Sequence, residues 1–245
     1  EDIDWLRKNG AKHVFLKTGA YRPSVVAFTM KVASEAKIDA VTFDGAGGGT
    51  GMSPVPMMDE MSTPTVYLEA QVLKCAEILR KKGRYVPDMA IAGGFISETQ
   101  IFKALGMSNF GKEPYVKAVL MARSPLTAVM KSSYFVELSK AGKLPKDFAD
   151  NYGSIPEKFF VATPKLKETY KERFREIPWE AIGLYTYLNE GIKVGLQQLM
   201  AGARKWKLNL LDRSDIVSLN ERAAKVTGIP LLEETEIDTM EKILG

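Results

Sequence analysis

The chain has 245 residues, of which 45% are hydrophobic and 26% charged, a balance typical of a globular chain with one or two domains. The formal net charge of +4 is small and the lysines are dispersed, so no nucleic-acid partner is expected. A single cysteine, Cys75, excludes an internal disulfide and a multi-cysteine metal site. No apolar run reaches about 18 residues and no signal-peptide pattern opens the sequence, so we expect a cytoplasmic protein that does not bind membranes.

The first half of the chain alternates short apolar runs with helical stretches, a pattern typical of parallel strands covered by helices. It predicts four units in which a strand precedes a helix. The predicted strands are 13–17, 40–43, 89–92 and 115–122. The predicted helices are 23–37, 63–83, 98–105 and a stretch that ends at residue 131. From about residue 140 onward the pattern predicts helices alone, over 165–176, 181–204 and 212–228, with Ser214 capping the last.

Polar or glycine-rich residues follow each predicted strand. Lys17 ends the first strand, Arg22 lies five residues further on, and Asp44 follows the second strand directly. Because the carboxyl ends of parallel strands share one edge of the sheet, we expect these residues to line a ligand site. Glycines reach positive φ easily and let backbone N–H groups converge on an anion. The other candidates after the strands are Gly48, Gly49, Thr50, Gly51, Gly93, Gly94, Ala122 and Arg123.

Some of these candidates suit a phosphate group. In barrels of eight strand–helix units, phosphate commonly binds between the loops after the last two strands. Gly93, Gly94 and Arg123 are placed for that role. Each also has a structural alternative, since glycines serve close packing, arginines form surface ion pairs and Lys17 can extend to solvent. Their occurrence together favours a phosphate site. Glu69, in contrast, is expected to be solvated, and the only histidine, His13, has no partner for a zinc site or a Ser-His-Asp triad.

Four segments in a fixed order carry a family resemblance. They are Leu16-Lys17, Val41 to Gly45 continuing into Gly48 to Pro54, Ala90 to Gly94, and Met121 to Leu126. The most specific of them reads Gly-Gly-Thr-Gly-x-Ser-Pro. In this order the segments, over about residues 13–130, resemble the flavin-binding domain of glutamate synthase and its stand-alone relatives, the glutamate synthase-like FMN proteins.

The resemblance implies a (β/α)8 TIM barrel that holds FMN. Residues 1–135 would supply the C-terminal four units of this barrel, and residues 136–245 a helical extension. The resemblance also implies that Lys17 is catalytic and lies near the flavin ring and the substrate, where a cation stabilises the anionic reduced flavin or holds a carboxylate. Arg22 and Asp44 are then expected to bind substrate. Lys17, the glycines and the remaining candidates are expected to bind the cofactor.

The implied activity is hydride transfer between FMN and a small 2-oxo or 2-imino acid, as in enzymes that act on CH-NH2 donors and serve glutamate biosynthesis. Residues 121–140 contain no cysteine for an iron–sulfur cluster, and no glutamine amidotransferase domain is present, which makes the stand-alone relatives the closer match. Two alternatives stay open. One is another FMN-binding or phosphate-binding barrel enzyme, such as an isomerase or dehydrogenase; the other is a non-catalytic flavin-binding or scaffold subunit of a redox complex.

Four units make only half of such a barrel, and an open half exposes two sheet edges. We therefore expect the N-terminal half to come from upstream residues or from another chain, with a dimer of half-barrels as the less favoured arrangement. A small carboxylate substrate and an electron-donor protein are the other expected partners.

Overall fold

The structure, a computed structural model, describes residues 1–46 and 54–245. The chain divides into two compact units. The first consists of Glu1–Phe95, Gln100–Leu120 and Met200–Gly245, and the second of Ile96–Thr99 and Met121–Leu199. Among the described residues, no helix combines the length and the apolar character that a membrane span requires.

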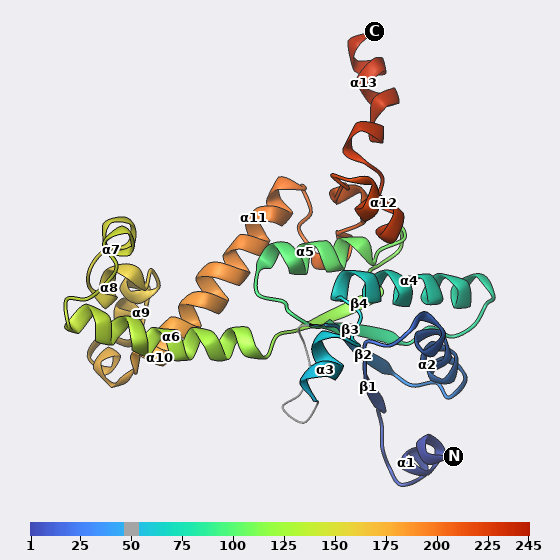
Figure 1. The fold of residues 1–245 in the computed structure, drawn as a ribbon, viewed down its shortest axis with the longest axis horizontal. Helices are drawn as coiled ribbons and strands as arrows, with labels where there is room; N and C mark the ends of the chain where they lie inside the picture. The colour runs from blue at the N-terminus through green and yellow to red at the C-terminus, as the bar shows by residue number, and fades with distance from the viewer. Residues whose placement is uncertain (47–53) are drawn as a thin grey trace. The chain divides into compact units, whose positions relative to one another are not determined.

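A parallel sheet of four strands forms the centre of the first unit (Figure 1). The strands are adjacent in chain order: β1 (Phe15–Gly19), β2 (Ala40–Asp44), β3 (Asp88–Ala92) and β4 (Val116–Leu120). Asp44 is in register with Gly19 on one side and with Ala92 on the other, so the first three strands end level with one another. The predicted alternation of strands and helices is thus confirmed, with strand limits that differ by up to two residues.

Helices cover one face of this sheet. Figure 1 shows α4 (Thr65–Lys81) running along the sheet, and α4 contacts β2, β3 and helix α2 (Pro23–Glu35). The side chains that point into this core are fully buried; they include Val26, Met30, Val41, Phe43, Leu68, Val72, Met89 and Ile91. The other helices in this part of the chain are α1 (Asp2–Lys8), α3 (Val55–Asp59), α5 (Glu98–Met107), α12 (Glu221–Thr227) and α13 (Ile237–Leu244).

The opposite face of the sheet carries small or exposed side chains. Thr42 points to this face, because its neighbours in β2, Val41 and Phe43, are buried on the other. Phe15, at the start of β1, is 70% exposed. One row of residues in register across the sheet consists of Lys17, Thr42, Ala90 and Ala118. In the described part of the chain, β1 pairs with β2 alone, so β1 forms an open edge.

The C-terminal segment returns to the first unit. Ile229 is buried together with Leu73 of α4 and Met107 of α5. The Asn109 side-chain amide donates to the carbonyl of Leu211 at 2.8 Å. Arg213 donates to the carbonyls of Met107 at 2.8 Å and of Thr227 at 2.7 Å. The last part of the sequence therefore completes the core that the strands and helices begin.

The predicted helix over residues 212–228 is wrong in its first half. Arg213–Asp215 forms a single 3-10 turn, η4, and Ser218 makes a parallel bridge with Leu231. Asp212, not Ser214, caps η4 by accepting the Ser214 N–H at 2.8 Å. Asn220 caps α12 through the N–H of Ala223, and Gly228 ends α12 with φ +67° as predicted.

The second unit consists of helices around an aromatic-rich core. Its elements are α6 (Arg123–Lys140), α7 (Lys146–Tyr152), α8 (Pro156–Phe159), α9 (Thr163–Tyr170), η1 (Lys171–Glu176), α10 (Trp179–Tyr185), η2 (Thr186–Lys193) and α11 (Val194–Gly202). The core residues are Val136, Phe160, Ala162, Leu166 and Ile182. Gly183 of α10 lies against Ser132 of α6 so closely that a Cβ would overlap the hydroxyl, so the glycine lets the two helices cross.

Three predictions for this unit change in detail. The helix predicted over 165–176 ends at Tyr170 and continues as the 3-10 helix η1. The helix predicted over 181–204 contains a π-helical stretch, η2. Helix α6 continues to Lys140 instead of ending at residue 131. It also runs through residues 135 and 136, where we placed the end of the barrel half, and that domain division stays a prediction.

Candidate functional site

Two predicted site residues meet at the carboxyl edge of the sheet. Lys17 Nζ lies 3.1 Å from Asp44 Oδ2. Lys17 is in register with Thr42, two residues before Asp44, so its side chain extends along the sheet toward the strand ends. The lysine side chain is 52% exposed, whereas the Asp44 side chain is only 10% exposed. The pair therefore presents an accessible cation that is held by a largely buried carboxylate.

A glycine pair follows β3 at the same edge. Gly93 has φ +115° and Gly94 has φ +76°, values that residues with a side chain rarely adopt. A Cβ on Gly93 would lie 2.5 Å from Thr65 Oγ1 and 2.7 Å from the Gly45 carbonyl oxygen. Among the described residues, a Cβ on Gly94 would meet no atom closer than the Ala46 carbonyl oxygen, at 4.0 Å. Gly93 is thus required by space and conformation together, while the described residues around Gly94 leave its backbone open.

Thr65, which the sequence analysis missed, connects these loops. Its hydroxyl donates to the Gly93 carbonyl oxygen at 2.6 Å and lies against Gly45. The Gly45 N–H donates to the Ala92 carbonyl oxygen at 2.8 Å. The start of α4 is therefore fixed to the residues that follow β2 and β3. The available signal was the Pro64-Thr65 pair at a helix start, which did not indicate these distant partners.

Glu69 lies one helical turn after Thr65, and the expectation that it is solvated is wrong. Its side chain is buried, with the residue only 3% exposed, and Oε1 has no hydrogen-bond partner in residues 1–46 and 54–245. Burial raises the pKa of the Glu69 carboxyl well above its ordinary value. The group is therefore poised to be protonated at a pH where ordinary carboxyls are charged. The overlooked signal is an acidic residue between the apolar positions Leu68 and Val72.

The other predicted residues are less closely grouped or fall elsewhere. Arg22 precedes α2 in the loop after β1, and its side chain is exposed. Ala122 and Arg123 belong to the second unit, where they begin α6. Gly48, Gly49, Thr50 and Gly51 lie outside the described residues. The structure therefore brings together Lys17 and Asp44, with Gly93 and Gly94 following the neighbouring strand.

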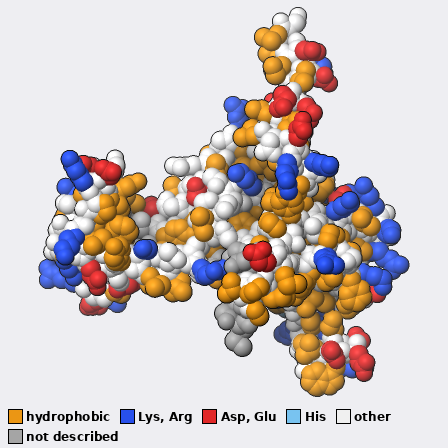
Figure 2. Space-filling view, viewed as in Figure 1, with side chains coloured by type: hydrophobic (Ala, Val, Ile, Leu, Met, Phe, Trp, Pro, Cys, Tyr) orange, Lys and Arg blue, Asp and Glu red, His pale blue; other side chains and the backbone are white. Residues whose placement is uncertain are grey.

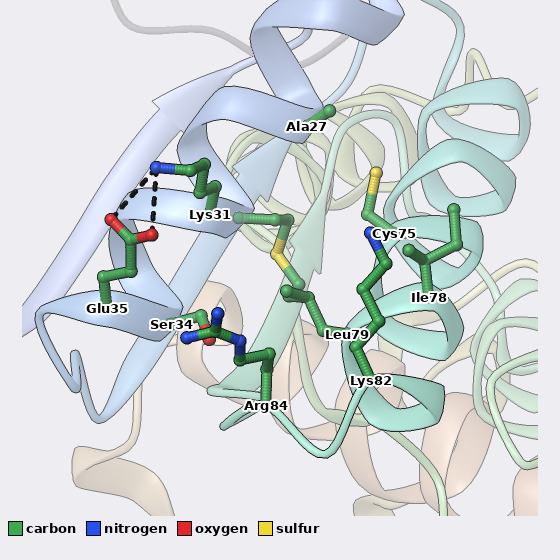
Figure 3. A pocket seen from close by; sticks show the side chains of 10 residues that line it. Ala27, Lys31, Ser34, Glu35, Cys75, Ile78, Leu79, Lys82 and Arg84 are labelled. Atoms are coloured by element: carbon green, nitrogen blue, oxygen red, sulfur yellow. Dashed lines mark hydrogen bonds and ion pairs between the residues drawn. The ribbon is translucent and has the colours of Figure 1, made fainter.

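A cavity of about 270 Å³ between α2 and α4 is separate from this edge (Figure 3). It is lined by residues from the later turns of both helices, including Met30, Cys75 and Leu79, together with Lys82 and Arg84. The strand ends, in contrast, lie beside Thr65 at the beginning of α4. Burial raises the pKa of the Cys75 thiol, which keeps it in its weakly nucleophilic form. The cavity thus contains none of the predicted site residues.

Metal binding has no visible basis in the described part of the chain. No cluster of three or more His, Cys, Asp or Glu side chains in residues 1–46 and 54–245 could hold a metal ion. His13 instead lies beside Asp39, with 3.5 Å between Nδ1 and Oδ1, at the opposite end of β2 from the glycine loops.

Comparison with known proteins agrees with the resemblance. Residues 1–122 match a family model described as the conserved region in glutamate synthase. A comparison of the chain with curated proteins found no match. The matched range contains all four strands and every predicted site residue except Arg123. Residues 1–122 therefore contain a glutamate synthase-like domain.

Proposed function

We propose that this chain belongs to an FMN-dependent oxidoreductase that transfers hydride between the flavin and a small 2-oxo or 2-imino acid. The match of residues 1–122 to the conserved region in glutamate synthase is the observation that carries this proposal. When bound, FMN supplies the two-electron chemistry, because its ring accepts and returns a hydride. The chain's own residues then have to bind the cofactor, place a cation beside it and orient the substrate.

The residues after β3 fit a phosphorylated cofactor. Both glycines have positive φ, and no described residue fills the space beside Gly94. Backbone at such positions can approach a phosphate or a flat ring at contact distance. We therefore propose Gly93 and Gly94 as cofactor-binding residues. The same role for Gly48, Gly49, Thr50, Gly51, Ala122 and Arg123 rests on the family resemblance.

Lys17 is the proposed catalytic residue. Its ammonium group is accessible and lies at the strand ends, beside the position where Asp44 leads into the glycine loop. A cation held there would favour negative charge that develops on the cofactor or substrate. Arg22, exposed in the loop after β1, is proposed to bind the substrate carboxylate, since a guanidinium can contact both carboxylate oxygens.

We also propose that a further set of strand–helix units completes the barrel next to β1. Helix α2 supports this proposal, because it has two apolar faces. Val26 and Met30 are buried, while Val25, Phe28 and Val32 form an exposed stripe on another face. Hydrophobic side chains reach the surface over β1 and α2 in Figure 2. A parallel strand beside β1 and its helix beside α2 would cover both surfaces.

The source of these units is either upstream sequence or a second polypeptide. The proposal is tested by purifying the chain with and without the upstream coding region and measuring its mass in solution and its absorbance spectrum. We expect stable flavin binding only when the completing units are present. A full complement of FMN on residues 1–245 alone, as a monomer, would contradict barrel completion by another segment.

The decisive test of cofactor identity is an absorbance spectrum followed by release of any chromophore. Flavin absorption and recovery of FMN are the expected results. A colourless protein that also fails to take up added FMN would contradict the proposal. Reduction of the bound flavin by a candidate donor then separates an enzyme from a scaffold subunit.

A second candidate function follows from the glycine pair itself. Gly93 and Gly94 suit any phosphorylated ligand and do not require a flavin ring. An isomerase or dehydrogenase built on a phosphate-binding barrel would use them equally well. Binding of a non-flavin phosphorylated compound in place of FMN would favour this candidate.

A further inference from the structure

Asp44 has surroundings that do not suit direct contact with a carboxylate substrate. Its side chain is 10% exposed, and its Oδ2 atom lies 3.1 Å from the Lys17 ammonium. A carboxylate of the substrate would be repelled by the Asp44 charge and attracted by Lys17. The more exposed member of the pair is therefore the one that can meet an anion, and the more buried member supports it.

We propose that Asp44 is a positioning residue: it holds the Lys17 ammonium at the carboxyl edge of the sheet and reduces the positive charge presented there. The expected effects on the flavin and on turnover rest on the proposed flavin function. The ion pair between Asp44 and Lys17 does not depend on that function. The positioning role replaces the expectation that Asp44 binds substrate.

The backbone around Asp44 is suited to holding a flexible partner. Asp44 is the last residue of β2, between β1 and β3 in the sheet. The next residue, Gly45, donates its N–H to the Ala92 carbonyl oxygen at 2.8 Å, which fixes the end of the strand. Lysine has a long stem with many rotamers, so a partner on a fixed strand removes most of its freedom.

The pair also sets the local charge. An unpaired lysine would present a full positive charge to a neighbouring flavin or substrate, whereas the Lys17–Asp44 pair is neutral overall. Asp44 is thus expected to reduce the stabilisation that Lys17 gives to negative charge while improving the placement of the ammonium. Since the lysine is half exposed, the contribution of the pair to folding is expected to be small.

The first test needs no cofactor and measures the ion pair directly. The full chain and its Asp44→Asn variant are treated with an amine-acylating reagent, and modification of Lys17 is followed by mass spectrometry. Loss of the pair should raise the Lys17 reaction rate several-fold, while Lys31, which pairs with Glu35 at 2.9 Å, serves as an internal reference. An unchanged Lys17 rate would overturn the proposal, whatever the cofactor.

The second test uses the FMN-loaded protein, with the completing units where these are required. Asp44→Asn should raise the midpoint potential of the flavin and lower kcat about tenfold with little change in KM, whereas loss of a substrate contact would mainly raise KM. Asp44→Glu should restore part of kcat. In a Lys17→Met background, Asp44→Asn should lower kcat no further, because the ammonium that Asp44 positions is already gone.

Asp39→Asn is the matched control, because it removes the same charge from the other end of β2. It should leave the midpoint potential and kcat unchanged. An equal loss of kcat on Asp44→Asn with and without Lys17, or a pure KM effect, would overturn the positioning role. A protein that shows the change in Lys17 reactivity but binds no FMN would instead contradict the flavin function and leave the ion pair standing.

Discussion

The two ends of the parallel sheet differ in how their polar groups are satisfied. At the amino end, the Asp39 carboxylate accepts hydrogen bonds from the Val14 N–H at 2.8 Å and from Arg7 at 3.1 Å. The Val14 hydrogen bond is the main cause that lowers the Asp39 pKa. At the carboxyl end, Lys17 has one charged partner in the described residues and remains half exposed.

A second cluster of polar groups at the amino end of the sheet is also joined by hydrogen bonds. Arg80 donates twice to the Glu77 carboxylate, at 2.8 and 2.7 Å, and the Tyr115 hydroxyl donates to it at 2.7 Å. Burial and the hydrogen bond to Glu77 raise the pKa of Tyr115 to about 12. Carboxylates that accept hydrogen bonds from several neighbouring groups indicate a structural role, while an accessible cation near glycines with positive φ indicates a ligand site.

Gly93→Ala, at the carboxyl end of the sheet, should have the largest effect on stability. The new Cβ would lie 2.5 Å from Thr65 Oγ1 at a positive φ, so the free energy of unfolding should fall by about 2–4 kcal/mol. Urea denaturation measures this loss. Gly94→Ala is the control: it has the strain of a positive φ but no close contact with any described residue, and it should cost about 1 kcal/mol. Equal losses in the two variants would contradict the steric argument.

Glu69→Gln should change how stability depends on pH. The folded-state pKa of Glu69 lies above its unfolded value of about 4.3. Between these two pKa values the folded state keeps the Glu69 proton and the unfolded state loses it, so the stability of the wild type falls as pH rises through this range. Glutamine cannot ionise, so the variant should exceed the wild type by about 1–3 kcal/mol at pH 8 and match it near pH 4. Urea titrations at both pH values test this. Identical pH slopes would show that Glu69 is not buried as described.

Glu77→Gln tests the cluster at the amino end of the sheet. Its effect on stability should depend on pH in the opposite direction to that of Glu69→Gln. Hydrogen bonds from Arg80 are the main cause that lowers the Glu77 pKa, so its contribution is present above the unfolded pKa of about 4.3 and disappears as pH falls through the folded value. The variant should lose about 1–2 kcal/mol at pH 7 and keep its flavin binding. Denaturation and FMN titration are the measurements, and weakened FMN binding would argue against a purely structural role.

Lys17→Ala should have the smallest effect on folding and a large effect on function. The pair is partly exposed, so the free energy of unfolding should change by less than about 0.5 kcal/mol. We expect turnover and the flavin midpoint potential to fall. Stopped-flow reduction and a redox titration measure these quantities, and unchanged values for both would remove Lys17 from the mechanism.

The strands were predictable because their signals are local. Each apolar run ends at a polar or glycine residue, and this local signal alone predicts Lys17, Asp44 and Gly93 as site residues. Thr65 was missed because its role depends on Gly45 and Gly93, which are distant in sequence from the helix it begins. Glu69 was missed because acidic residues are usually solvated, and only the fold reveals its burial.

The predicted helix after Asp212 failed for a related reason. Arg213 binds carbonyls of Met107 and Thr227, and these contacts favour a short turn over the continuous helix that the local pattern suggested. The π-helical stretch η2 likewise has no signal in the apolar spacing used for prediction. Contacts between residues distant in sequence therefore determine the secondary structure after Asp212, and the local apolar pattern does not contain that information.

The contact between Asn109 and Leu211 has a consequence for the order of events during synthesis. These residues are 102 positions apart, and the carbonyl of Leu211 becomes available only after most of the chain has left the ribosome. Until then Leu73 and Met107 lack Ile229, their late neighbour. This part of the core, between α4 and α5, therefore remains incompletely covered while residues 121–199 are made, and its apolar side chains are then accessible to a chaperone.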